Sequence, residues 1–156
     1  MPLGLENKID DISKKILLRL QENSRESFAS IGRVVGLTPP AVAERVKKME
    51  DLGILEGYKA RVNHLKMGYQ LRAIVTIKAF MGKLKPFLEK VRSMKEVINC
   101  YRITGNENII MEVVLLDQLH LEQFIDQLIQ YGETRTHIIL SDIVSDAPIN
   151  GNKSTR

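Results

Sequence analysis

The chain has 156 residues, of which 44% are hydrophobic and 27% charged, a composition typical of a folded protein rather than a disordered or fibrous one. The single cysteine, Cys100, excludes a disulfide framework, and no apolar run approaches the roughly 18 residues that a membrane span needs. The first residues lack a signal-peptide pattern, so we expect a cytoplasmic protein without a membrane partner. The net charge of +4 permits a nucleic acid as the partner.

The N-terminal part of the chain shows helical periodicity after residues 1–8, which carry no pattern and are expected to form a flexible arm. Apolar residues then recur at spacings of three and four from Ile9 to Leu20, which predicts a helix. Asp10 and Ser13 are both candidate N-caps, because a short side-chain oxygen can accept a hydrogen bond from the first free N–H groups of a helix.

Two further helices are predicted in this half. A short helix over residues 28–35 is expected to end at Gly36, and the next begins with Thr38 as N-cap and Pro39 in the first turn. Gly32 suits a close crossing of two helices, and Gly36 suits a tight turn because glycine accepts a left-handed backbone. This spacing is typical of a helix-turn-helix that binds DNA, and the alternative is an ordinary small helical bundle.

In a helix-turn-helix, the N-terminal residues of the second helix face base edges in the major groove. The candidate DNA-binding residues are Thr38, Pro39, Pro40, Ala43, Glu44, Arg45, Lys47 and Lys48. The short apolar side chains favour contact with thymine methyl groups and recognition of DNA shape. The lysines, together with Lys59 and Arg61, favour phosphate contacts. Two roles stay open for Glu44, a cytosine contact or an ion pair with a neighbouring lysine, and two for Arg45, a base contact or a salt bridge to the first helix.

The second half of the chain alternates between strand and helix patterns, after residues 54–63, which are expected to form a short extended hairpin or a connector. Predicted strands cover residues 71–80, 97–104, 109–116 and 134–144, and helical stripes cover residues 84–91 and 121–129. The turn Gly105–Asn108 joins the second and third strands as a hairpin. The order strand-helix-strand-strand-helix-strand predicts a ferredoxin-like fold, and the polar residues 145–156 are expected to form a flexible tail.

Several motifs also carry a resemblance to a known family. They are Asp10 followed by Ser13, Ile16 and Leu17; Gly36-Leu37-Thr38; Val42, Arg45-Val46 and Met49-Glu50; Gly53-Ile54-Leu55-Glu56-Gly57-Tyr58; TGNENIIMEV; and the spacing from Asp117 to Phe124. In residue type and spacing they resemble the Lrp/AsnC (feast/famine) transcriptional regulators over roughly residues 9 to 144. Pattern and resemblance together predict an α+β protein. It has a three-helix winged helix-turn-helix DNA-binding domain (9–58), a connector (59–69) and a ferredoxin-like βαββαβ effector-binding and oligomerisation domain (70–144).

The resemblance implies a regulator that binds double-stranded DNA as a homodimer built through the C-terminal sheets, usually assembled into a tetramer of dimers, an octamer. It also implies an amino-acid effector bound between dimers. The candidate effector-binding residues are Thr104, Gly105, Asn106, Glu107, Asn108, Tyr131, Thr134 and Thr136. Many relatives have an aromatic residue and then Asp where this chain has Glu107 and Asn108, and Asn108 supplies no charge to pair with an α-ammonium group. For Thr134 and Thr136 the alternative role is sheet packing.

No catalytic site, metal site or cofactor is predicted. His64, His120 and His137 lie far apart without the spacing of metal ligands, Cys100 is interpreted as a packed strand residue, and no phosphate-binding glycine loop is present. We therefore expect a DNA-binding regulator in the cytoplasm, associated with the nucleoid. The alternatives are an architectural protein that wraps DNA with low specificity and no amino-acid effector, and a sheet module that only oligomerises or binds metabolites.

Overall fold

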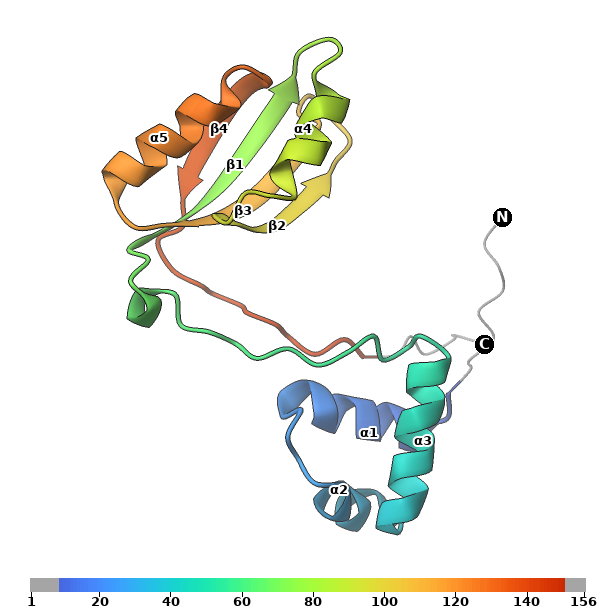
Figure 1. Cartoon of the computed structure of the whole chain (residues 1–156). Helices are drawn as coiled ribbons and strands as arrows, with labels where there is room; N and C mark the ends of the chain where they lie inside the picture. Colours follow the sequence, from blue (N-terminus) through green and yellow to red (C-terminus); the bar gives the residue numbers. More distant parts are fainter. Residues whose placement is uncertain (1–8, 151–156) are drawn as a thin grey trace. The chain divides into compact units, whose positions relative to one another are not determined.

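The polypeptide divides into two compact units. Of residues 9–150, which the computed structural model describes, the first unit contains 9–60 and 144–150 and the second contains 61–143 (Figure 1). The segment that follows the sheet therefore returns to the helical unit, where a flexible tail was predicted from residue 145. The predicted arm, residues 1–8, and the last part of the predicted tail, residues 151–156, lie outside the described residues.

The first unit consists of three helices, as the sequence predicts. They are α1 (Asp11–Glu22), α2 (Phe28–Val35) and α3 (Pro39–Asp51). Each helix begins at a side chain that accepts a hydrogen bond from the backbone three residues further on, and the three caps are Asp10, Ser27 and Thr38. Because the Asp10 carboxylate accepts the N–H of Ser13, Asp10 is the cap of α1 and Ser13 is not. Gly36 ends α2 in the left-handed conformation, with φ at 74°.

The core of this unit comes from the apolar stripes of the three helices. Its buried residues are Ile16, Leu20, Ile31, Val42, Val46 and Met49. They recur at helical spacing within each helix, so each helix turns one face inward. Burial of such side chains contributes about 1.5–3 kcal/mol each, and this is what fixes the three short helices against one another.

The predicted wing is not formed. No strand occurs between α3 and residue 70: the chain runs without a ladder over residues 55–63 and then makes a short 3₁₀ turn, η1 (Leu65–Met67). A hairpin needs two paired strands with one buried face, and every residue from 56 to 63 is exposed. Of the two expectations for this segment, the connector is correct and the hairpin is wrong.

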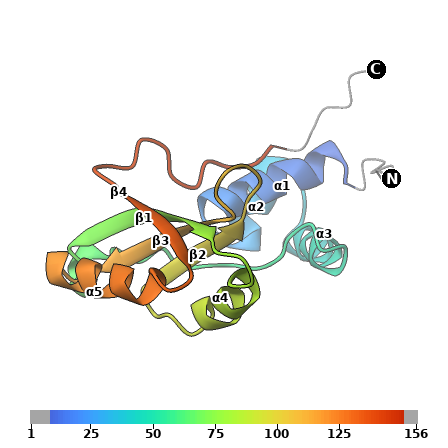
Figure 2. The same cartoon turned by 90° about the horizontal axis from the view of Figure 1, so that it is seen from above.

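The second unit is a four-stranded antiparallel sheet with two helices. Its elements are β1 (Leu71–Ala79), α4 (Leu84–Val91), β2 (Val97–Arg102), β3 (Ile109–Leu115), α5 (Gln118–Leu128) and β4 (Gly132–Ile138). The strand order is β2-β3-β1-β4, and α4 and α5 cover the same face of the sheet (Figures 1 and 2). This is the predicted ferredoxin-like arrangement.

The helices and the sheet enclose a second core. Its fully buried members are Ala73, Val75, Ile77, Phe87, Ile109, Met111, Val113, Leu115, Phe124 and Leu128. On β1 the buried residues alternate with Arg72, Ile74, Thr76 and Lys78, which therefore lie on the face that the helices leave open. Ile129, predicted in the stripe of α5, follows the end of the helix and is 56% exposed.

The last strand is shorter than the predicted 134–144. It ends at Ile138, which pairs with Ala73 of β1, and one further backbone bond follows: the N–H of Ile139 donates to the carbonyl of Arg72 at 2.9 Å. Beyond that bond, Leu140 and Ile143 are 93% and 88% exposed. Their apolar character predicted a strand, but a strand also needs backbone hydrogen bonds to a neighbouring strand.

Candidate nucleic-acid interface and effector loop

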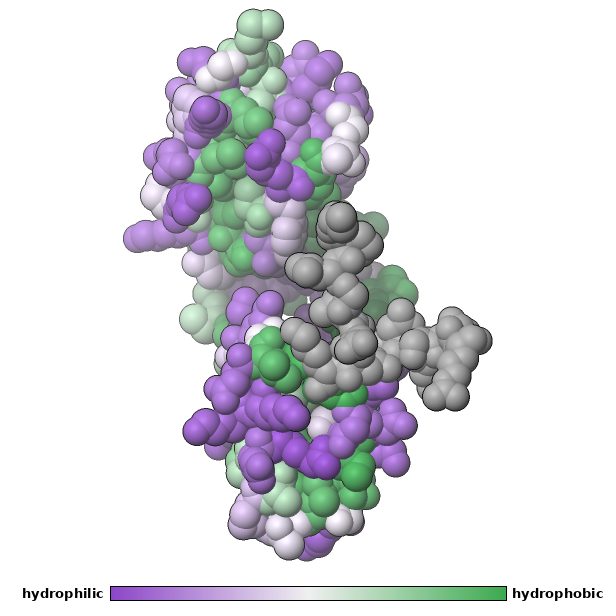
Figure 3. All heavy atoms as spheres, turned by 90° about the vertical axis from the view of Figure 1, so that its right-hand side faces the viewer, coloured by the Kyte–Doolittle hydropathy of each residue, from purple (hydrophilic) through white to green (hydrophobic). Residues whose placement is uncertain are grey.

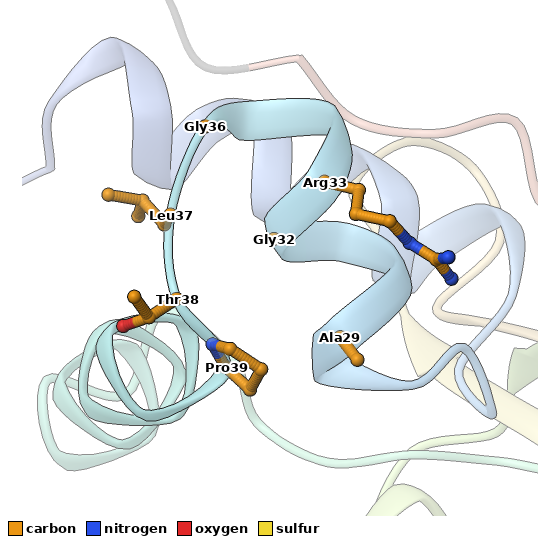
Figure 4. A pocket seen from close by; sticks show the side chains of 7 residues that line it. All are labelled: Ala29, Gly32, Arg33, Gly36, Leu37, Thr38 and Pro39. Atoms are coloured by element: carbon orange, nitrogen blue, oxygen red, sulfur yellow. The ribbon is translucent and has the colours of Figure 1, made fainter.

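The turn between α2 and α3 is built on two glycines. The N–H of Leu37 donates to the carbonyl of Gly32 at 2.9 Å, which folds the chain back across α2 (Figure 4). A Cβ atom on Gly32 would clash with the backbone carbonyl of Leu37, so no other residue fits without movement of the turn. Gly36 supplies the positive φ that reverses the chain. The close crossing predicted at Gly32 is thus observed, and it holds the first turn of α3 beside α2.

The outward face of α3 carries most of the candidate DNA-binding residues. Exposed are Thr38, Pro39, Pro40, Glu44, Lys47 and Lys48, whereas Ala43 and Arg45 are half-buried. The buried Val42, Val46 and Met49 occupy the opposite face. Among the described residues no ion pair joins Glu44 to either lysine, so its carboxylate stays open to solvent. The side chains on this exposed face are short and mostly apolar at its N-terminal end and cationic at its C-terminal end.

Arg45 is engaged inside the helical unit. One of its terminal nitrogens donates to both carboxylate oxygens of Asp10, at 2.7 and 2.6 Å, and to the hydroxyl of Ser13 at 2.9 Å. The hydrogen bond from Arg45, followed by that from the Ser13 N–H, lowers the pKa of Asp10 from 3.8 to about 2. Of the two roles left open for Arg45, this geometry favours the salt bridge to the start of α1.

A cation that the sequence analysis did not include lies next to the turn. Arg33, in the last turn of α2, is exposed and lines a shallow hollow together with Thr38 and Pro39 (Figure 4). It points away from the three-helix core, on the side of α2 that α3 leaves free. Its position directly after Gly32, where the helix crossing is predicted, was the available signal, but only the fold places it in one hollow with the first residues of α3.

Two side chains of the candidate effector loop between β2 and β3 bind neighbouring residues of the same chain. Thr104, Gly105 and Asn106 are exposed, but the side-chain oxygen of Asn108 accepts the N–H of Ala79 at 2.8 Å. The carboxylate of Glu107 lies 3.3 Å from the guanidinium of Arg135. Both side chains that differ from the resembling family thus have partners within the sheet.

The remaining candidate effector residues lie along β4 and its turn. The ring of Tyr131 packs against Phe87, with centroids 5.4 Å apart and planes at 60°, so it belongs to the edge of the core. Thr134 pairs with Ile77 and Thr136 with Val75, which places both threonines on the helix-covered face. The carbonyl of Ile77 also accepts the N–H of Asn108, so the loop and Thr134 border the same residue. The structure thus brings Thr134 next to the loop.

His120 and Cys100, which the sequence analysis does not assign to a catalytic or metal site, have these environments. The N–H of Leu116 donates to Nδ1 of His120 at 3.2 Å, and Nε2 lies 3.1 Å from a carboxylate oxygen of Glu96. Cys100 is half-buried, and burial raises the pKa of its thiol. Within residues 9–150 no three His, Cys, Asp or Glu side chains gather as metal ligands, and none of the helices there has the length and apolarity to cross a membrane.

A helix-turn-helix followed by a ferredoxin-like sheet defines a class of protein, the DNA-binding regulators with a separate regulatory domain. Comparison with protein families matches the AsnC-type helix-turn-helix domain over residues 9–50 and the Lrp/AsnC ligand binding domain over residues 72–149. The chain belongs to the Lrp/AsnC family of transcriptional regulators.

Individual relatives agree with this assignment over most of their length. The chain is 31% identical over 136 residues to the HTH-type transcriptional regulator LrpC of Bacillus subtilis, covering 87% of this chain and 94% of LrpC. It is 30% identical over 142 residues to an uncharacterized HTH-type transcriptional regulator of Pyrococcus furiosus, covering 89% and 96%.

Solved structures show the same fold. The structure of B. subtilis LrpC matches with a TM-score of 0.83 at 30% identity, covering 88% of this chain and 99% of that one. Escherichia coli AsnC matches with a TM-score of 0.78 at 28% identity, covering 88% and 95%. A Neisseria meningitidis transcriptional regulator in complex with L-Met matches with a TM-score of 0.85 at 24% identity, covering 90% and 96%, which shows the fold alone.

Proposed function

We propose that the first unit binds double-stranded DNA by inserting the N-terminal half of α3 into the major groove. The observation that carries this proposal is the outward face of α3, held beside α2 by the Gly32 and Gly36 turn. In this arrangement Thr38, Pro40 and Ala43 contact thymine methyl groups and follow the shape of the groove. Pro39 and Glu44 lie on the same helical turns, and Glu44 selects a cytosine amine when one faces it.

Cations around this face bind the DNA backbone. Lys47 and Lys48 extend from the C-terminal end of the face, Arg33 stands beside its N-terminal end, and Lys59 follows in the connector. Phosphate contacts set the register of a protein on the duplex but carry no base information, which suits long, exposed side chains. Arg45 acts as a positioning residue, because its ion pair with Asp10 joins α3 to the start of α1.

The second unit is proposed as the assembly and effector domain. The sheet face opposite α4 and α5 carries apolar side chains, among them Ile74, Ile110 and the 58% exposed Tyr101. Figure 3 shows another side of this unit, where hydrophobic residues also gather among hydrophilic ones. We infer that the sheet face pairs with a second copy and that dimers assemble further, up to an octamer. Two α3 helices of a dimer then reach successive major grooves about 34 Å apart, one turn of DNA.

We further propose that an amino acid or a related metabolite binds near residues 104–108 and shifts the population of assembly states, as the match to the Lrp/AsnC ligand binding domain supports. One observation favours a second candidate, an architectural protein without an effector. The Asn108 carbonyl and the Glu107 carboxylate, the side chains available to an ammonium group, are bound to Ala79 and Arg135.

We propose that the protein acts by binding, without a catalytic step, and that it lies in the cytoplasm on the nucleoid.

The experiment that tests DNA recognition starts from selection of random duplexes by the purified full chain. We expect enriched sequences with two half-sites one helical turn apart. A plot of the logarithm of the binding constant against the logarithm of the salt concentration should have a slope of about −0.9 for each contacted phosphate. Equal affinity for selected and scrambled duplexes supports the architectural candidate, and no binding at low salt refutes both. For the effector, each amino acid, L-methionine included, is added in thermal unfolding after refolding from denaturant. A ligand at 100 times its dissociation constant adds about 2.7 kcal/mol per site.

A further inference from the structure

The segment after β4 is held at both ends although it forms neither helix nor strand. Near its start, within the second unit, the carboxylate of Asp142 lies 2.6 Å from the guanidinium of Arg72, which also binds Glu112 at 2.6 Å. The backbone N–H of Ile139 donates to the carbonyl of the same arginine at 2.9 Å. The chain therefore leaves the sheet from a fixed point.

Its far end is bound to α1, within the first unit. The N–H of Ile149 donates to the side-chain oxygen of Gln21 at 2.8 Å, and the Gln21 amide nitrogen donates to the carbonyl of Ile149 at 3.0 Å. A primary amide offers one acceptor and one donor side by side, so it satisfies both backbone groups of a single residue, as a neighbouring strand does. The contact joins residues 128 positions apart in the sequence.

The backbone before Ile149 is shaped for this contact. Asp146 has a φ of 49° and is the one non-glycine residue with a left-handed backbone among residues 9–150. Asp tolerates this conformation better than most residues, and Pro148 has a restricted φ of its own. The bend at Asp146 and the proline limit the conformations of the segment just ahead of the residue that Gln21 holds.

We propose that residues 144–150 form a strap that docks on α1 of the same chain through Gln21 and restrains the DNA-binding unit. The docking surface is the last turn of α1, and its partner is the chain's own C-terminal segment. Because the polypeptide passes between the units twice, at residues 60–61 and 143–144, the docked strap gives the first unit a second attachment.

The consequence concerns DNA sites that need two recognition helices. A docked strap lowers the conformational freedom that each first unit loses when both helices of a dimer bind, so it strengthens binding to a full site. It leaves binding of one helix-turn-helix to a half-site unchanged, since no second engagement follows. This part of the proposal rests on the paired DNA binding proposed above, whereas the docking itself does not.

Docking is tested by cleavage of the full chain with an Asp-specific endoprotease, with products at Asp146 identified by mass. Gln21→Ala removes the amide, and Ile149→Pro removes the N–H that Gln21 accepts. Their matched controls are Gln123→Ala, an exposed glutamine of α5, and Ile149→Ala, which keeps the N–H. We expect cleavage at Asp146 to be about threefold to tenfold faster in the two test variants, as loss of one or two hydrogen bonds implies, and unchanged in the controls. Equal rates in all five proteins would overturn the docking.

The effect on DNA is measured with the same proteins on a full site and on one half-site. Gln21→Ala and Ile149→Pro are expected to bind the full site about threefold to tenfold more weakly and the half-site within about twofold of wild type. An equal loss on both sites, or none on the full site, would overturn the restraint. If the wild type binds no DNA, the proposed function fails, and the cleavage rates still decide whether the strap docks.

Discussion

The ion pair between Arg45 and Asp10 gives a prediction whose size follows from the structure. Arg45→Met keeps most of the side-chain stem and removes the charge that binds Asp10 and Ser13. The pKa of Asp10 falls from 3.8 to about 2, its side chain is 53% exposed, and one pKa unit corresponds to about 1.4 kcal/mol; after solvent screening we expect about 1 kcal/mol from the pair. The Ser13 hydroxyl, in a residue only 6% exposed, also loses its partner, so the total loss is about 1–2 kcal/mol.

The pH dependence of this loss has a defined sign. Because the pKa of Asp10 is lower in the folded than in the unfolded protein, the pair stabilises the fold fully above pH 3.8 and loses its contribution as the pH falls toward about 2. Thermal unfolding followed by circular dichroism at pH 6 and at pH 2.5 measures this. At pH 6 we expect Arg45→Met to lower the melting temperature of the helical unit by about 5 to 10 °C. At pH 2.5 the difference from wild type shrinks; an equal difference at both values would refute the reasoning.

A second variant separates the two roles of Arg45. Asp10→Asn breaks the same ion pair from the other side and leaves the arginine in place, still able to reach a base. If Arg45 only positions α3, both variants weaken binding to all DNA sequences alike. If Arg45 contacts a base, Arg45→Met alone relaxes specificity at one position, at a cost of about 1–3 kcal/mol there. Retained specificity in both variants would confirm the positioning role.

Three further predictions concern single residues. Gly32→Ala forces a Cβ against the Leu37 carbonyl and should cost more than about 2 kcal/mol in the free energy of unfolding; an unchanged denaturation midpoint would show that the turn yields freely. Asn108→Ala leaves the Ala79 N–H without its acceptor and should cost about 1 kcal/mol, measured by urea unfolding, whereas Asn108→Asp keeps the acceptor and most of the stability. Lys47→Ala should reduce the salt slope of DNA binding by about 0.9, while Lys15→Ala on α1 leaves it unchanged; equal slopes in both variants would remove Lys47 from the phosphate contacts.

Local chemistry made much of this protein predictable. The helix start at Thr38 and the helix stop at Gly36 follow from a hydrogen bond over three residues and from one backbone angle, which neighbouring residues alone decide. Strand alternation in β1 and the order of elements predicted the ferredoxin-like sheet in the same way. Gly32 was identifiable because a helix crossing needs a residue without a side chain at that spacing.

What the sequence could not decide are contacts between residues far apart in the chain. Ser13 is an acceptor for Arg45 rather than a cap, and the side-chain oxygen of Asn108 accepts the N–H of Ala79 at the end of β1. Gln21 binds Ile149, 128 residues away. β4 ends at Ile138, and one further backbone hydrogen bond joins Ile139 to Arg72 of β1, although the apolar residues beyond have the pattern of a strand. A side chain's hydrogen-bonding capacity is set by its own chemistry, but which partner takes it up depends on what the completed fold brings within about 3 Å.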